Sequence, residues 1–123
     1  MSGWTAAELA AIGGATELEI SSRRADGTLR PFVPVWVVRS GDELYVRSAY
    51  GAANGWYRRA LAAGFGQIRA GGLTRDVSFV AETIDVDHAY HTKYDRYGPA
   101  IVGTVVGPAV AALTIRLQKE TPS

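Results

Sequence analysis

The chain contains no cysteine among its 123 residues, so no disulfide can stabilise it, and its length makes such a cross-link unnecessary. The absence of thiols also fits a reducing compartment, and we expect a cytoplasmic protein. The sequence also lacks an excess of positive or negative charge, because 13 basic and 12 acidic residues leave a net charge of +1 at pH 7. We therefore expect no nucleic-acid partner, and any anion site must be local.

Long hydrophobic runs are also missing from the sequence. The most apolar stretch, 100–113, is interrupted by Gly103, Gly107 and Pro108 and is shorter than the roughly 20 residues that cross a bilayer. The first 12 residues lack the basic start and the apolar core of a signal peptide. We therefore expect neither a membrane span nor export. Without internal repeats or a shift in composition, residues 1–123 are expected to form one domain.

The spacing of apolar residues predicts about six strands and three short helices. Strand-like alternation covers the segments 17–21, 32–38, 44–48, 65–70, 73–81 and 113–118. Helical spacing covers 6–12, 55–63 and 85–97, and Thr5 with Glu8 forms a capping-box pattern at the first of these. The pairs Asp26-Gly27 and Gly71-Gly72 favour tight hairpins between antiparallel strands. An open sheet would leave unpaired edge strands, and closing the sheet on itself removes them. The pattern therefore predicts a mainly β (α+β) barrel with short helices.

The segment 32–38 differs from the other predicted strands because both of its faces are apolar. Such a strand is expected to be covered on both sides, and one of these sides can be a subunit contact. Pro34 lacks the N–H that a central strand would donate, so it predicts a bulge or a locally unpaired edge.

A strand-loop-helix junction carries the residues that best suit an anion. Arg47 and Ser48 end a strand, Gly51 lies in the loop, and Asn54 can cap the helix that follows. Free amides at a helix start, a guanidinium and a hydroxyl can together bind a phosphate. The alternative is a solvated arginine beside an ordinary loop, and the pattern by itself does not decide between them.

Motifs in a fixed order resemble the deazaflavin-dependent nitroreductase group of the split-barrel flavoproteins. They are Pro34 to Gly41 (PVWVVRSG), the strand ending in Ser48, the loop glycine Gly51, and Trp56-Tyr57 followed by Leu61. The chain is similar to an uncharacterised family, a domain of unknown function, that is related to this group and more distantly to pyridoxamine phosphate oxidase. The resemblance covers residues 16–81. It implies a six-stranded antiparallel split β-barrel of the FMN-binding type and a homodimer with the cofactor groove at the subunit boundary.

The resemblance also implies a cofactor, FMN or a deazaflavin coenzyme, and a set of residues to bind it. The implied cofactor-binding residues are Arg30, Trp36, Arg47, Ser48, Tyr50, Gly51, Trp56 and Arg58. For Trp36, a place in the core or in a dimer interface is the alternative. Two departures from the group's pattern bear on cofactor binding: Ala49 stands where a lysine is expected, and arginine at 59 or 58 where an asparagine is expected.

The C-terminal part of the sequence contains further candidates. In the nitroreductase group, C-terminal tyrosines border the substrate pocket, which implies Tyr94 or Tyr97 as a proton donor; the alternative is that they bury their rings and leave the hydroxyl at the surface. His88 and His91 lack a third ligand, so we predict no metal site. The glycine-punctuated segment 98–108 is either a flexible flap over the cofactor or a buried irregular crossing.

These expectations point to a flavin- or deazaflavin-dependent oxidoreductase that transfers hydride to a small molecule. Two alternatives stay open: a dimeric barrel that binds a small phosphorylated or aromatic ligand without turnover, and a protein-interaction module. The sequence contains no nucleophile elbow, Walker loop or dinucleotide fingerprint, so hydrolase and classical nucleotide-enzyme functions lack support. The substrate and the choice between flavin and deazaflavin are not indicated by any motif.

Overall fold

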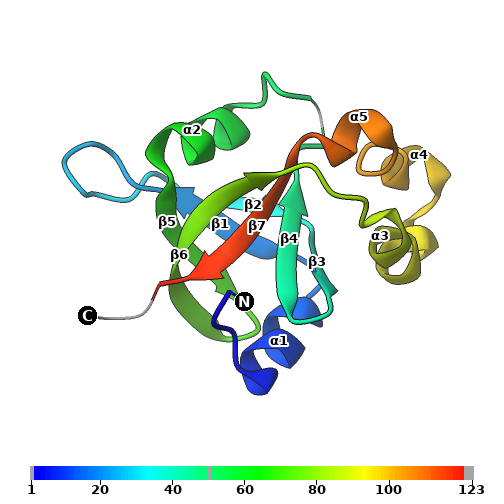
Figure 1. Cartoon of the computed structure of the whole chain (residues 1–123), viewed down its shortest axis with the longest axis horizontal. Coiled ribbons are helices and arrows are strands. Elements are labelled where there is room, and N and C mark those ends of the chain that lie inside the picture. The colour runs from blue at the N-terminus through cyan, green and yellow to red at the C-terminus, as the bar shows by residue number, and fades with distance from the viewer. Residues whose placement is uncertain (1, 50, 121–123) are drawn as a thin grey trace.

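The computed structural model describes residues 2–49 and 51–120, and its strands form one antiparallel sheet in the order β2-β1-β5-β6-β7-β4-β3. The strands are β1 (Leu18–Ser22), β2 (Val33–Val35), β3 (Val37–Ser40), β4 (Glu43–Arg47), β5 (Phe65–Ala70), β6 (Leu73–Glu82) and β7 (Thr114–Lys119). The two edge strands, β2 and β3, are consecutive in the chain, so the sheet curls until its edges nearly meet (Figure 1). The result is the predicted mainly β barrel with short helices.

The predicted strand over 32–38 is in fact two strands, and this accounts for seven strands instead of the predicted six. Trp36 separates β2 from β3, because the chain must pass there from one edge of the sheet to the other. Pro34 lies in β2 and pairs with Glu19 of β1, leaving its other side as a sheet edge. The expectation of an unpaired edge at this proline is confirmed, since proline cannot donate a ladder hydrogen bond.

Both predicted hairpins are present. A bridge between Arg23 and Leu29 continues the β1–β2 pairing toward the Asp26-Gly27 turn. Ala70 pairs with Leu73 across the two glycines that join β5 to β6. At Gly66 of β5, an added Cβ atom would lie 2.0 Å from the carbonyl oxygen of Ser21. Only glycine permits this close approach of two strands, which a tightly curved barrel requires.

The helices are α1 (Ala6–Gly13), α2 (Gly55–Ala63), α3 (Asp87–Tyr94), the 3-10 helix η1 (Asp95–Tyr97), α4 (Pro99–Val102) and α5 (Pro108–Ala111). The predicted capping box is present: Thr5 Oγ1 accepts from the Glu8 amide at 3.1 Å, and Glu8 Oε1 accepts from the Thr5 amide at 2.9 Å. The predicted bounds of α2 are confirmed, although Asn54 makes no side-chain capping bond within the described part of the chain. The helix predicted over 85–97 begins later and changes to a 3-10 turn after Tyr94.

Two hydrophobic clusters hold these elements together. The first fills the barrel, and α1 closes one end of it through Leu9 and Ile12 (Figure 1). The second lies outside the barrel, where Val38 and Tyr45 pack against residues of α3 and α4. Segment 32–38 is therefore covered on both faces at its β3 end, and the outer cover belongs to the same chain. No described helix is long and apolar enough to span a bilayer.

Candidate functional site

An apolar pocket of about 400 Å³ lies between the edge strand β2, the start of α2 and the segment around α4. Trp36 and Trp56 line it, together with Val33 and Val35 of β2. Ile101, Thr104 and Val105 form another part of its lining. The volume falls within the roughly 300–1,000 Å³ that is typical of small-molecule sites. We refer to this hollow as the apolar pocket.

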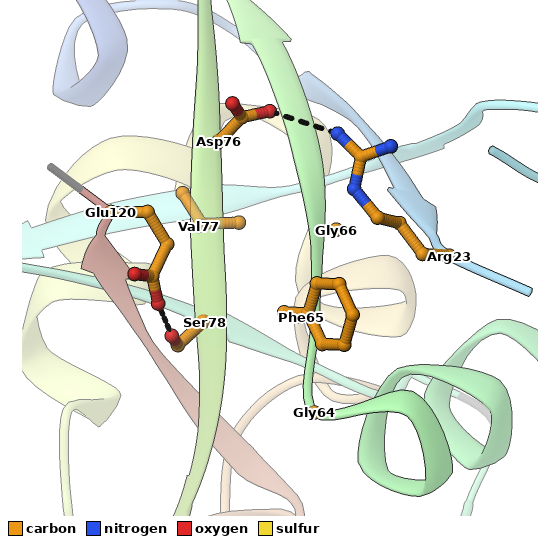
Figure 2. A pocket seen from close by; sticks show the side chains of 8 residues that line it. All are labelled: Arg23, Gly64, Phe65, Gly66, Asp76, Val77, Ser78 and Glu120. Carbon is orange, nitrogen blue, oxygen red and sulfur yellow. Dashed lines mark hydrogen bonds and ion pairs between the residues drawn. The ribbon is translucent and has the colours of Figure 1, made fainter. Parts of the chain in front are cut away.

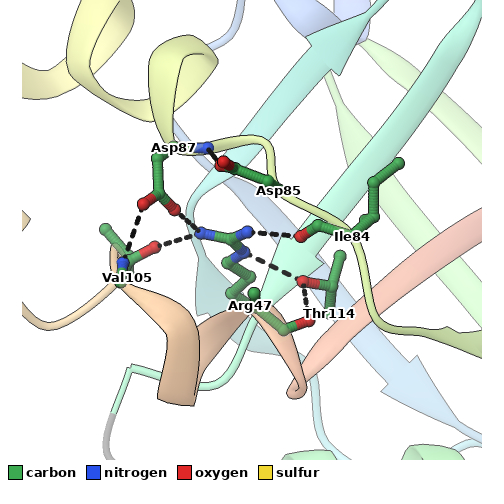
Figure 3. Close-up of polar contacts among 8 residues, drawn as sticks. Arg47, Ile84, Asp85, Asp87, Val105 and Thr114 are labelled. Carbon is green, nitrogen blue, oxygen red and sulfur yellow. Dashed lines mark hydrogen bonds and ion pairs between the residues drawn. The ribbon is translucent and has the colours of Figure 1, made fainter.

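Arg47, at the end of β4, lies beside the apolar pocket with a side chain that is fully buried. Its Nε donates to Thr114 Oγ1 at 2.9 Å, and one terminal nitrogen donates to Asp87 Oδ1 at 2.6 Å and to the Val105 carbonyl at 2.8 Å. The other terminal nitrogen donates to the Ile84 carbonyl at 2.7 Å (Figure 3). The interpretation of a solvated arginine is therefore wrong. The contact of Arg47 with a phosphate stays a prediction, and all three guanidinium nitrogens already have protein acceptors.

The Asp87 carboxylate forms an ion pair with the buried guanidinium of Arg47. Its second carboxylate oxygen accepts from the Gly107 amide at 2.9 Å. Burial works to raise the pKa of Asp87, but the hydrogen bonds from Arg47 and Gly107 outweigh it and hold this pKa below its usual range. The carboxylate is therefore charged at neutral pH and links α3, β4 and the turn before α5.

The predicted phosphate loop begins at Ser48, which is fully buried. Its hydroxyl donates to the Gly51 carbonyl at 2.6 Å, and Gly51 has a φ of 91°, which favours glycine. This hydrogen bond closes the loop between β4 and α2. Tyr50, which we predicted as a cofactor contact, lies outside the described residues.

The two predicted proton donors lie in different environments. Tyr94 is fully buried, stacks on Trp36 at 3.9 Å between ring centroids, and accepts from the Val37 amide at 3.0 Å while donating to the Thr16 carbonyl at 2.7 Å. Burial raises the pKa of its hydroxyl above the usual range. Tyr97, in contrast, is 41% exposed, and its ring lies 5.6 Å from that of Trp36. Tyr97 is therefore the tyrosine that lies at the surface, whereas the hydroxyl of Tyr94 is buried.

Lys93 on α3, like Tyr94, bonds to backbone groups of its own chain. Its ammonium donates to the Gly13 carbonyl at 2.9 Å and to the Val37 carbonyl at 2.7 Å, which joins the end of α1 to β3. Burial lowers the pKa of Lys93 to about 8.

On the exposed side of α3, His91 Nδ1 pairs with Asp95 at 2.7 Å. Within residues 2–49 and 51–120, no three metal-binding side chains lie together.

Five arginines line a second hollow, of about 540 Å³, between the 23–30 hairpin and α2; they are Arg23, Arg24, Arg30, Arg58 and Arg59. We refer to it as the arginine cleft. Arg23 donates to the Gly27 carbonyl and Arg24 to the Leu29 carbonyl, each at 2.9 Å. The guanidinium groups of the other three have no hydrogen bond or ion pair to any described residue. No acidic residue lines the cleft, so its charged lining is entirely cationic although the net charge of the chain is only +1.

The arginine cleft contains Arg30 and Arg58 of the predicted cofactor set. It also contains Arg23, Arg24 and Arg59, which the sequence interpretation missed. The two Arg-Arg pairs in the sequence were a signal, but only the packing of the hairpin against α2 shows that both pairs face one hollow. A narrow crevice of about 10 Å³, lined by Val33 and Trp56, lies between the arginine cleft and the apolar pocket. Trp56 therefore stands at the boundary between an apolar and a cationic environment.

A third hollow, of about 430 Å³, lies across β5 and β6 on the other side of Phe65 (Figure 2). Phe65 is 47% exposed and lines both this hollow and the arginine cleft. Here Asp76 pairs with Arg23 at 3.2 Å, and Glu120 accepts a hydrogen bond from the neutral Ser78 hydroxyl. This third hollow therefore carries charges of both signs, whereas the charged residues that line the arginine cleft are all cationic.

Comparison with known proteins gives a family and a fold. A family model described as "Uncharacterized protein conserved in bacteria (DUF2255)" matches residues 8–117. Among solved structures, an F420 reductase superposes with a TM-score of 0.52 at 15% sequence identity, covering 92% of this chain and 93% of that one. At this identity the likeness shows the fold alone. No curated protein matches the chain.

Proposed function

Because the chain belongs to the DUF2255 family of bacterial proteins and has the fold of an F420 reductase, we propose that it binds a flavin or deazaflavin coenzyme. We propose further that it is an oxidoreductase that transfers hydride between this coenzyme and a small molecule. The observation that carries the proposal is the apolar pocket, which Trp36 and Trp56 line, beside a cleft with three arginines that lack described partners. The ring system of such a coenzyme needs an apolar pocket, and its phosphate needs a cationic cleft.

The residues present fit such a coenzyme. Trp36 and Trp56 offer aromatic surface to a planar ring, and the pocket volume of about 400 Å³ suits a small-molecule ligand. Arg30 and Arg58 would bind the phosphate through charge-assisted hydrogen bonds. When bound, the coenzyme would supply the hydride chemistry, and the protein would supply orientation and exclusion of water.

Tyr97 is the proposed proton donor. Its hydroxyl accepts from the Arg96 guanidinium at 3.1 Å, and its ring lies next to Trp36 at the pocket lining. Tyr94 does not suit this role, because its hydroxyl is buried and bonded to backbone groups of β3 and of residue 16.

A specific observation favours the second candidate, a barrel that binds a phosphorylated or aromatic ligand without turnover. Ala49 lines the apolar pocket at the position where the related nitroreductases have a lysine, and Arg47 beside it is bonded to protein acceptors. The pocket itself therefore offers little positive charge to stabilise a reduced, anionic ring. Binding would then depend on the arginine cleft, and hydride transfer would not follow from it.

We also propose that a second copy of the chain completes the pocket. The split-barrel resemblance implies a homodimer with the groove at the subunit boundary. Ile101, at the pocket lining, is 52% exposed, and the edge strand β2 has a free side. Both features suit burial by a partner of the same kind.

Titration of the purified protein with FMN and, separately, with the deazaflavin coenzyme tests these proposals. Saturable quenching of tryptophan fluorescence, together with reduction of the bound ring by an added hydride donor such as NADPH, supports the oxidoreductase. Binding without reduction under the same conditions supports the second candidate. Light scattering on the same sample reports the number of copies. Arg30→Gln or Arg58→Gln should weaken binding by roughly 10- to 100-fold, the loss expected for one charge-assisted hydrogen bond.

Arg39→Gln is the matched control for these two variants. Arg39 is exposed and donates to the Gly41 carbonyl at 2.8 Å, in a turn that is not part of the arginine cleft. The substitution changes the net charge equally and should leave the affinity unchanged. If neither coenzyme binds the unaltered protein, the oxidoreductase proposal is wrong, and a protein-interaction function gains support.

A further inference from the structure

The buried guanidinium of Arg47 joins the barrel to the segment that lines one side of the apolar pocket. We propose that Arg47 is a positioning residue: it holds segment 98–107 in place as the pocket wall and does not bind the phosphate of the ligand. The proposal rests on the proposed function only in taking the apolar pocket as the ligand site. Its structural part concerns the chain without any ligand.

The acceptors of Arg47 come from distant parts of the chain. Ile84 precedes α3, Val105 follows α4, and Thr114 begins β7 (Figure 3). One planar guanidinium therefore fixes three segments relative to the end of β4. Lysine has the same charge but lacks the fork of donors that reaches several acceptors at once.

Segment 98–107 has few other polar links to the sheet. Within the described part of the chain its backbone hydrogen bonds are local, such as those from Val102 to the Gly98 carbonyl at 3.1 Å and from Val105 to the Val102 carbonyl at 3.0 Å. Among the described residues, the hydrogen bond from Arg47 to the Val105 carbonyl is the one that joins this segment to the sheet. Losing it should loosen the segment more than it loosens the barrel.

Asp87 adds a second link, at Gly107, where the segment ends. One of its oxygens accepts from Arg47 at 2.6 Å and the other from the Gly107 amide at 2.9 Å. Gly98 and Gly107 both have positive φ angles, 100° and 104°, so the segment lies between two glycine turns. The guanidinium thus holds the C-terminal part of the segment directly at Val105 and, through the carboxylate, at Gly107.

The wall matters to a ligand because its side chains line the apolar pocket. Ile101, Thr104 and Val105 all contribute to the lining, and Val105 supplies the carbonyl that Arg47 binds. Ile101 is 52% exposed, so the segment is held by Arg47 and by the burial of Val102 and Val105 in the second hydrophobic cluster. A displaced wall would change contacts with a ring in the pocket and would leave a phosphate in the arginine cleft untouched.

A pair of ligands separates positioning from direct phosphate contact. Arg47→Lys should weaken binding of FMN and of riboflavin, which lacks the phosphate, by the same factor of roughly 10 or more. Arg30→Gln should weaken FMN alone. The deazaflavin coenzyme and its phosphate-free ring compound form an equivalent pair. If Arg47→Lys weakens FMN and leaves riboflavin unchanged, Arg47 contacts the phosphate and the proposal is overturned.

Hydrogen exchange of the ligand-free protein gives a second readout. In Arg47→Lys, the amides of 98–107 should exchange about tenfold faster, while those of β5 and β6 stay as in the unaltered protein. The matched control is Arg75→Lys, because Arg75 pairs with buried Glu8 at 2.6 Å where α1 covers the barrel. It should leave the exchange of 98–107 unchanged. Equal acceleration throughout the chain, or none in 98–107, would overturn the proposal.

A further variant covers the case in which Arg47→Lys does not fold. Asp87→Asn keeps the guanidinium and removes its charge partner, and it should loosen the same segment by the same two readouts. If the unaltered protein binds none of the four ligands, the proposed function fails. The exchange of 98–107 then still decides whether Arg47 positions this segment.

Discussion

Neutralising Glu8 is expected to remove a large part of the pH dependence of stability. The Glu8 carboxylate is buried where α1 covers the barrel and accepts hydrogen bonds from Lys119 at 2.9 Å and Arg75 at 2.6 Å. Burial alone would raise its pKa, but the bonds from Lys119, the Thr5 amide and Arg75 outweigh burial and lower the pKa from 4.5 to about 2. At about 1.4 kcal/mol per pKa unit, this shift corresponds to roughly 3 kcal/mol of stability.

The sign of the effect follows from the depressed pKa. The unfolded chain binds a proton at Glu8 below its ordinary pKa of 4.5, whereas the folded chain does so only near 2. The contribution of Glu8 is therefore complete above pH 4.5 and is lost as the pH falls toward 2. Glu8→Gln should lower the free energy of unfolding by about 2–3 kcal/mol at neutral pH and by much less near pH 2.

Urea titrations of both proteins across this pH range measure the difference. Glu19→Gln is the matched control, because Glu19 pairs with Arg69 at 3.6 Å and both side chains are about half exposed. Such a surface pair contributes at most about 1 kcal/mol. The reasoning would be refuted if Glu8→Gln were as mild as this control, or if its effect did not shrink on acidification.

Two further substitutions test the packing around the barrel. Tyr94→Phe keeps the stack on Trp36 but leaves the buried Val37 amide without its acceptor, so chemical denaturation should show a loss of about 1–3 kcal/mol; an unchanged midpoint would contradict the role of this hydroxyl. Gly66→Ala places a Cβ atom 2.0 Å from the Ser21 carbonyl oxygen, a backbone atom that cannot rotate away. We expect a loss of at least about 3 kcal/mol or no soluble protein in expression trials, and normal stability would contradict this close approach.

Local patterns predicted much of the secondary structure because the interactions behind them are local. The capping box at Thr5 and Glu8 involves residues three apart, and the helix over 55–63 was predicted with its exact bounds. The break at Trp36 was not predictable in this way. Alternating apolar residues continue on both sides of it, and only the closure of the barrel sends the two halves to opposite edges.

The candidate site was partly predictable. Trp36, Trp56 and Arg47, which the family resemblance implied as cofactor-binding residues, all line the apolar pocket, and their contacts with a cofactor stay predictions. Arg30 and Arg58 instead lie in a separate cleft. Residues of similar type and position in the sequence thus divide between two environments that a linear motif does not distinguish.

By itself, the sequence determined features that depend on neighbours a few residues away: the hairpin turns, the capping box of α1, the bounds of α2 and the alternation of buried and exposed side chains. The tertiary structure decided which partners its polar side chains meet. Arg47 is an internal anchor because Ile84, Asp87, Val105 and Thr114, 37 to 67 residues away, bring their oxygens to it. Whether a charged group binds a ligand or its own chain depends on which acceptors folding places within about 3 Å, and sequence spacing does not record that.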